Sequence, residues 1–274
     1  MTHILKIIDS ISMPGNSKIT NQDYIDFNDQ CVLLLDGATP LEDKQLYPVE
    51  QFVRNFSEIF FNKFNNEDEV LSLVTETCQK LTAAKSIPIE NFPSASSIIL
   101  TVYNRKLKLT QVGDCKAYIY DGNSIKVAFP TTRIEQLDLI ALNMMEGYQN
   151  LGFSVEKSKE MVKPTLLAHR KLKNAKEGYP SLSVGLSNAL DLINQVQIDL
   201  SNNHQYKILL ASDGFYNGFE SYQPETLELI FSRELSLKDA LSGYREIEAL
   251  DSGLTNFPRF KPSDDATAVL LALD

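Results

Sequence analysis

The sequence is poor in the residues that build disulfide frameworks and zinc sites. It has three cysteines, none of them in a C-x-x-C pair, so neither a disulfide framework nor a zinc–thiolate site is indicated. It also has three histidines, none in H-E-x-x-H or H-x₃-H spacing, which argues against a histidine metal site.

Long apolar runs and an excess of positive charge are also missing. No apolar run approaches the roughly 20 residues of a membrane helix, and the N-terminal segment carries Asp9 without the apolar core of a secretion signal. Lys and Arg total 26 against 36 Asp and Glu, a net charge of −10. Nucleic-acid binding is disfavoured, because phosphate contacts need Lys and Arg on one face. We therefore expect a cytoplasmic protein that binds neither nucleic acid nor membranes. We also expect a monomer.

The 274 residues are 43% hydrophobic and 23% charged, a composition typical of a globular protein. No internal repeat and no Gly/Ser- or Pro-rich linker interrupts the chain, which predicts a single domain over residues 1–274. Residues 133–176 have helical periodicity and are rich in Lys and Glu, so we expect a helical insertion there. Its expected apolar face consists of Leu137, Ile140, Ala141 and Met144.

Short apolar runs alternate with helical segments along the chain. The run CVLLL at Cys31–Leu35 is too short for a helix and predicts a buried strand. Four β-type runs between residues 97 and 128, separated by turn residues, predict an antiparallel meander. Helical spacing predicts two helices within residues 52–81 and two more within residues 223–250. Further strands are expected at Val196–Leu200, Tyr206–Ala211 and Ala266–Leu273.

Acidic residues stand directly beside several of these β-type runs. They are Asp36, Asp114, Asp213 and the pair Asp264-Asp265. The first three each have a neighbouring glycine, which permits positive φ and close approach of the backbone to a ligand. One Asp-Gly after a strand usually marks only a turn, but four acidic positions at strand ends indicate a site. Converging carboxylates repel unless a cation lies between them. Oxygen ligands without His or Cys favour Mg²⁺ or Mn²⁺.

Five short segments in fixed order carry a family resemblance. In this sequence they read KITNQD (18–23), LLDG (34–37), QVGDCKAY (111–118), LLASDGF (209–215) and SDDATAV (263–269). They resemble, in the same order, the R-x-x-N-Q/E-D, V-x-D-G, G-D-S-R-A-Y, L-L-x-S-D-G and D-D/N-x-T/S-V segments of the metal-dependent protein phosphatase family (PPM, type 2C) in its bacterial form. Any single match is weak, whereas the ordered set spans nearly the whole chain.

The resemblance implies both a fold and a reaction. The fold is an α+β four-layer α-β-β-α sandwich, with two central antiparallel β-sheets flanked by helices. The reaction is hydrolysis of phosphoserine and phosphothreonine in a phosphorylated protein substrate. A water bridging two Mg²⁺ or Mn²⁺ ions attacks the phosphorus, and bacterial relatives hold a weaker third ion.

The resemblance also assigns roles to individual residues. Asp36 would bridge two cations, and the carbonyl of Gly37 would ligate the second of them, with Asp23 near it. Asp213 and Asp264 would ligate the first cation, and Asp114 with Asp213 the third. Lys18 takes the place of the arginine that binds substrate phosphate. The implied catalytic residues are Asp36, Asp213 and Lys18.

Three departures from the family pattern leave alternatives open. Lys18 lacks the bidentate fork of arginine, Ala38-Thr39-Pro40 replaces the usual glycine pair, and the leaving-group histidine after Asp-Gly in animal members is absent. The leading hypothesis is an active phosphatase. The alternative is a catalytically weak, phosphatase-like binding or regulatory module, and a metal-binding structural protein is the third reading.

Overall fold

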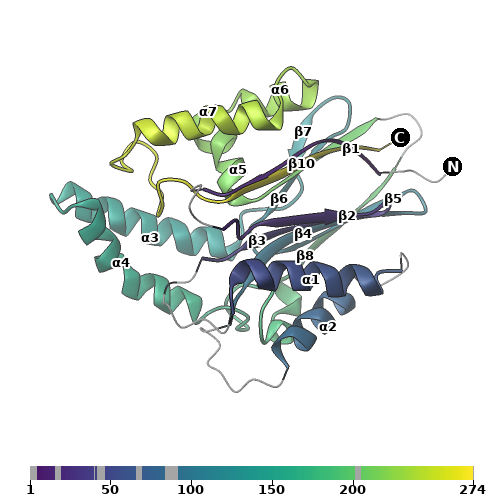
Figure 1. Ribbon diagram of the computed structural model, residues 1–274, viewed down its shortest axis with the longest axis horizontal. Coiled ribbons are helices and arrows are strands. Elements are labelled where there is room, and N and C mark those ends of the chain that lie inside the picture. The colour runs from purple at the N-terminus through teal and green to yellow at the C-terminus, as the bar shows by residue number, and fades with distance from the viewer. Residues whose placement is uncertain are drawn as a thin grey trace.

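Two antiparallel β-sheets lie face to face between layers of helices (Figure 1). The computed structural model describes residues 5–15, 20–39, 41, 47–65, 70–83, 92–200 and 205–273. Within that part, each sheet has five strands, and all pairings are antiparallel. The expected α+β four-layer sandwich is confirmed.

Each sheet combines segments that lie far apart in the sequence. The first has the spatial order β1 (Leu5–Met13), β10 (Ala266–Leu273), β9 (Tyr206–Ala211), β6 (Lys116–Tyr120) and β7 (Ile125–Val127). The second has the order β2 (Tyr24–Phe27), β3 (Cys31–Gly37), β4 (Ala95–Tyr103), β5 (Lys106–Val112) and β8 (Asn194–Asp199).

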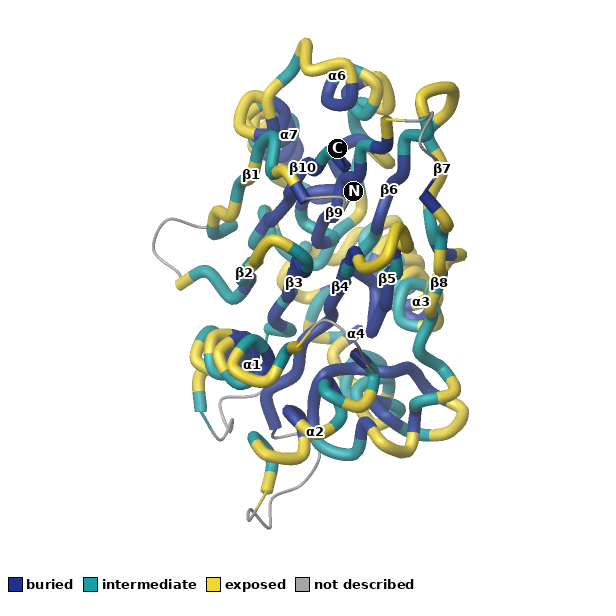
Figure 2. Tube along the Cα trace, turned by 90° about the vertical axis from the view of Figure 1, so that its right-hand side faces the viewer, coloured by how far each residue is buried: buried dark blue, intermediate teal, exposed yellow. Residues whose placement is uncertain are grey.

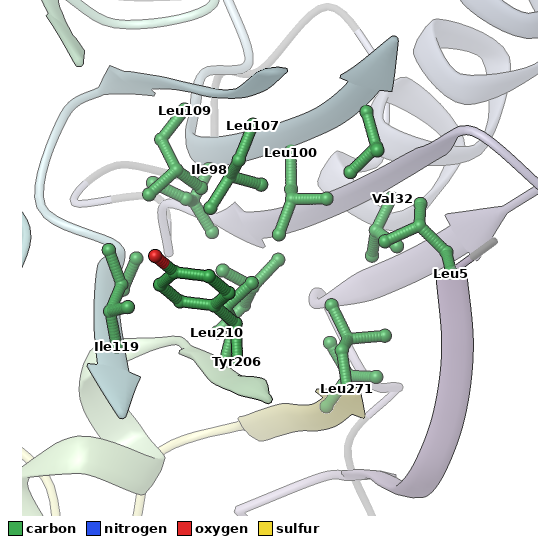
Figure 3. Close-up of a cluster of buried hydrophobic side chains, with 14 of the residues drawn as sticks. Leu5, Val32, Ile98, Leu100, Leu107, Leu109, Ile119, Tyr206, Leu210 and Leu271 are labelled. Carbon is green, nitrogen blue, oxygen red and sulfur yellow. The ribbon is translucent and has the colours of Figure 1, made fainter. Parts of the chain in front are cut away.

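The main core fills the space between the two sheets. Figure 3 shows its side chains, among them Ile98, Leu100 and Leu210, pointing into this space. The run in β3 explains why a strand can be apolar at every position. Val32 and Leu34 enter the inter-sheet core, whereas Leu33 packs on the helix side, so both faces of the strand are buried.

Helices cover the outer face of each sheet, and the burial pattern follows these layers (Figure 2). α1 (Val49–Lys63) packs its phenylalanine stripe against β3, and α2 (Val70–Thr82) lies beside α1. The other sheet is covered by α5 (Asp213–Asn217), the π-helix η4 (Gly218–Tyr222), α6 (Thr226–Ser232) and α7 (Leu237–Leu250). Two short 3₁₀ turns, η2 (Leu186–Asn188) and η3 (Leu190–Leu192), precede β8.

The expected meander over residues 97–128 is wrong, because the chain changes sheets between β5 and β6. β5 pairs with β4 and β8, whereas β6 pairs with β7 and β9. Gly113, with φ of 87°, begins the crossing, and a Cβ there would overlap the Ser96 side chain. The buried Gln111 amide then donates to the Cys115 carbonyl oxygen at 2.7 Å. This crossing holds Asp114 between the sheets.

Two helices form a hairpin at one end of the sandwich (Figure 1). They are α3 (Arg133–Asn150), which begins with a Thr132 capping box, and α4 (Val155–Arg170). The predicted helical character of residues 133–176 is thereby confirmed for two helices, whereas residues 151–154 form the connecting turn and residues 171–176 are turns rather than helix. Ile140, expected on the apolar face, is instead 49% exposed, and the buried face uses Leu137, Ala141 and Met145. Leu254 and Phe260 pack on this face, so the hairpin contacts the segment that precedes β10.

Candidate functional site

Acidic residues from both sheets line one cavity of ≈ 1260 Å³. Asp36 is the penultimate residue of β3, Asp213 follows β9 and begins α5, and Asp264 precedes β10. Asp114 lies on the crossing between β5 and β6 and lines the same cavity. The structure therefore brings together the four acidic positions that the sequence places at strand ends, and Gly37 lies beside them.

Asp23 is only 4% exposed and is not one of the cavity-lining residues, but it lies within electrostatic reach of Asp36 and Asp213. Its Oδ2 accepts a hydrogen bond from the Ser212 hydroxyl at 2.8 Å. Its Oδ1 is buried and accepts no hydrogen bond from the part of the chain that the structure describes. A buried carboxylate oxygen without a donor is costly, so a bound proton or a nearby cation would stabilise this atom.

The carboxylates raise one another's pKa values. Burial, followed by repulsion from Asp23 and Asp213, raises the pKa of Asp36 well above its usual value. Burial and then the charge of Asp264 do the same to the pKa of Asp213. Burial also raises the pKa of Asp114, and it raises the pKa of Asp23 to about 7 against the hydrogen bond from Ser212. The cluster therefore favours bound protons or cations.

An ammonium group already lies against one of these carboxylates. Lys261 Nζ lies 2.6 Å from Asp264 Oδ1 and 2.8 Å from Asp264 Oδ2. It also donates to the Thr39 hydroxyl at 2.7 Å. Thr39 belongs to the Ala38-Thr39-Pro40 stretch, which replaces the family's glycine pair. A hydrogen-bond acceptor for Lys261 is therefore present where a glycine would offer no side chain.

Glycines beside two of the acids allow chain segments to cross closely. A Cβ on Gly37 would overlap the Gln22 carbonyl oxygen and the Val49 side chain. A Cβ on Gly214 would overlap the Asp265 carbonyl oxygen. Close approach, rather than positive φ, is therefore the reason for glycine at these two positions.

Asp265 adjoins the cavity-lining Asp264, but its own carboxylate binds backbone N–H groups and so has a structural role. Its two carboxylate oxygens accept the backbone N–H groups of Gly15 at 2.9 Å and Gln22 at 2.7 Å. These bonds fasten the segment that carries Asp23 to the start of β10.

Sequence reasoning missed several side chains that line the cavity. Arg170 at the end of α4 donates to the Thr39 carbonyl oxygen at 3.0 Å. Asp138 on α3 has its pKa raised to about 7 by burial and by the charge of Asp114. Lys261 stands three residues before Asp264, and this short spacing is the sequence signal that could have placed it near the acids. The places of Arg170 and Asp138 depend on how the hairpin packs, which no local pattern reveals.

The donor set suits a divalent cation with oxygen ligands. Across the described ranges, no three Asp, Glu, His or Cys side chains are arranged to hold a metal ion. The residues nevertheless fit such an ion, because the cavity is lined by several carboxylates and one of them, Asp264, already binds a cation. Lys18, the expected phosphate ligand, lies outside the described residues.

The two stacked sheets, with helices outside them, have the fold of the PPM-type serine/threonine phosphatases, to whose solved structures the chain is similar over its full length. One is the catalytic domain of the phosphatase PstP in complex with two manganese ions, with a TM-score of 0.59, 14% identity and 100% of both chains covered. PppA of Pseudomonas aeruginosa has a TM-score of 0.58 and 11% identity, with 100% of this chain and 99% of that chain covered. The photosystem II phosphatase PBCP has a TM-score of 0.56 and 16% identity, with 98% of each chain covered.

Sequence comparison gives no match, since no family model and no curated protein matches the chain. The likeness therefore rests on the fold. Among the described helices, none is long and apolar enough to cross a membrane.

The raised pKa values predict how the stability of the metal-free protein depends on pH. The pKa of Asp23 is about 7 in the folded state against 3.8 for an ordinary aspartate, so from pH 8 to pH 6.5 only the folded state takes up this proton. The free energy of unfolding in EDTA should therefore rise as the pH falls through this window, by at most about 1.4 kcal/mol per pH unit for each proton bound. Urea unfolding at several pH values measures it. Asp23→Asn should make the slope less steep, with the rest of it coming from other acids such as Asp138, whose pKa is also raised to about 7. A free energy of unfolding that falls toward pH 6.5 would contradict the assignment.

Proposed function

We propose that this chain is a Mg²⁺- or Mn²⁺-dependent protein phosphatase that hydrolyses phosphoserine and phosphothreonine. The observation that carries the proposal is the convergence of Asp36, Asp114, Asp213 and Asp264 on one cavity in a chain with the PPM fold. A cavity of ≈ 1260 Å³ exceeds the roughly 300–1,000 Å³ of ordinary small-molecule pockets. Its size supports a phosphorylated protein segment as the substrate.

The proposal gives the following roles to this chain's residues. Asp36, the carbonyl of Gly37, Asp213 and Asp264 would hold two divalent cations, with Asp23 beside them, and Asp114 together with Asp213 would hold a third. Bound cations supply a water acidic enough to attack phosphorus and neutralise charge on the phosphoryl group. The Ser212 hydroxyl orients Asp23, and the bonds from Gly15 and Gln22 to Asp265 hold the neighbouring backbone in place.

Hydrolysis of p-nitrophenyl phosphate and of phosphopeptides tests the proposal. Turnover should require Mn²⁺ or Mg²⁺, stop in EDTA, and favour phosphoserine and phosphothreonine peptides over a phosphotyrosine peptide of the same sequence. Absence of metal-dependent turnover across all of these substrates would reject the proposed activity.

The second candidate is a catalytically weak binding or regulatory module. The observation that favours it is the Lys261 ammonium on Asp264, one of the carboxylates that the phosphatase reaction would need for metal. This candidate predicts metal binding with little turnover, whereas the phosphatase proposal predicts both. Metal titration beside the hydrolysis assay separates the two.

Lys18 is proposed to bind the substrate phosphate. Lys18→Ala should then lower kcat/KM, because a charge-assisted contact is lost. Lys18→Arg should preserve or raise kcat/KM, because the planar guanidinium can bind phosphate through two hydrogen bonds. A Lys18→Ala variant that matches the wild type at low substrate would show that this lysine does not contact phosphate.

The domain organisation of the chain is also a proposal. We take residues 1–274 as one phosphatase domain in which the α3–α4 hairpin is an insertion. The cytoplasmic location and the monomeric state stay predictions.

A further inference from the structure

The Lys261 ammonium has a complete set of hydrogen-bond acceptors. An ammonium has three donors, and Lys261 directs them to two oxygens of Asp264 and to the Thr39 hydroxyl. The Thr39 hydroxyl in turn donates to Gln22 Oε1 at 2.9 Å. The Lys261 ammonium therefore has a fixed place on the Asp264 carboxylate, with all three of its donors used.

The segment that carries Lys261 is fastened to α7 on several sides. Arg259 Nη1 donates to Asp251 Oδ2 at 2.6 Å, and Nη2 donates to the Glu248 carbonyl oxygen at 2.9 Å. Arg245 donates to the Asp264 carbonyl oxygen. Because its backbone is held at these points, Lys261 leaves Asp264 mainly through rotation of its own side chain.

The positive charge of Lys261 also acts beyond Asp264. It partly offsets the burial and repulsion that raise the pKa of Asp213, and it lies within the electrostatic reach of Asp36. One lysine thus neutralises part of a group of carboxylates that would otherwise repel one another.

We propose that Lys261 is a resident cation that competes with a divalent metal ion for Asp264 and thereby weakens the metal affinity of the site. The inference rests on the proposed function, because it needs Asp264 to be a metal ligand. A metal ion can take the Asp264 oxygens only after the ammonium releases them, and an ammonium that stays near repels the ion. Lys261 therefore acts on metal binding and is not assigned a contact with substrate.

Calorimetric titration of the metal-free full chain with MnCl₂ tests the proposal without an activity assay. Lys261→Met removes the charge and keeps an unbranched side chain, and it should tighten Mn²⁺ binding about tenfold. Lys261→Arg keeps the charge and should bind Mn²⁺ like the wild type. The matched control is Lys163→Met, which removes one positive charge from another lysine that lines the cavity.

Thermal unfolding gives a second readout on the same proteins. In EDTA, Lys261→Met should unfold at a lower temperature than the wild type, because Asp264 loses its counter-ion. The rise in unfolding temperature on adding Mn²⁺ should be larger than in the wild type. Lys261→Gln repeats the titration with a side chain that can still hydrogen-bond, should the Met variant fold poorly.

The outcomes separate this inference from the proposed function. Mn²⁺ binding by Lys261→Met no tighter than by Lys163→Met would overturn the inference while leaving the phosphatase proposal standing. A wild type that binds no Mn²⁺ would overturn both. A wild type that binds Mn²⁺ without hydrolysing any phosphate ester would overturn the proposed function alone, and the Lys261→Met titration would still decide the inference.

Discussion

Asp213→Asn is expected to lower the turnover of p-nitrophenyl phosphate at saturating Mn²⁺ by about 10²–10³-fold. The reason is that Asp213 is proposed to ligate two of the cations, and each such interaction contributes several kcal/mol to stabilising charge in the transition state. Steady-state kinetics with a full metal titration measures the effect and distinguishes weaker metal binding from slower chemistry.

The same variant should stabilise the metal-free protein. Burial and then repulsion from Asp264 and Asp114 raise the pKa of Asp213, so an uncharged amide at this position removes an unfavourable charge at pH 8. Asp199→Asn is the matched control, because this exposed residue lies on β8 opposite Lys106, at the other end of the sheet from Asp36. Equal activity of the Asp213→Asn protein and the wild type at saturating metal would remove Asp213 from the site.

Gly214→Ala is expected to damage both stability and metal-dependent activity. A methyl group there overlaps the Asp265 carbonyl oxygen, so the backbone between β9 and β10 must separate. Overpacking of this kind costs about 1–3 kcal/mol. The displacement also moves Asp264, whose Cβ lies 3.2 Å from the added carbon, so a weaker Mn²⁺ affinity should accompany the lost stability.

Gly147→Ala provides the control for this prediction. Gly147 lies in α3, and among the described residues no atom outside the neighbouring helix backbone lies within 4 Å of a Cβ added there. Alanine in a helix interior is favoured over glycine by about 0.5–1 kcal/mol, so this variant should be slightly more stable and fully active. Denaturant unfolding and Mn²⁺ titration of both variants make the comparison. Equal stability of Gly214→Ala and the wild type would mean that the close crossing is absent.

The sequence allowed the cavity carboxylates to be placed before the structure, because a residue next to a strand has its location set by that strand. Asp36, Asp213 and Asp264 adjoin β3, β9 and β10, whose apolar runs are visible locally. Their convergence follows from the fold, whereas their assignment as metal ligands stays a prediction.

The sheet exchange and the role of Lys261 were beyond local patterns. The apolar runs on either side of Gly113 look alike, and only pairing with the distant β8 and β9 decides which sheet each one joins. Lys261 reaches Asp264 because Arg259 and Arg245 shape the loop around it. Both features depend on contacts between segments that lie far apart along the chain.

The position of the acids on both sheets has a mechanical consequence. Asp36 belongs to one sheet, whereas Asp213 and Asp264 adjoin strands of the other. The cavity that these acids line therefore lies where the two sheets meet. A ligand bound by acids from both sheets would join the two sheets at this end of the sandwich. Sliding or parting of the sheets would then require breaking those bonds as well as exposing the core, so an occupied site would make the whole sandwich more rigid.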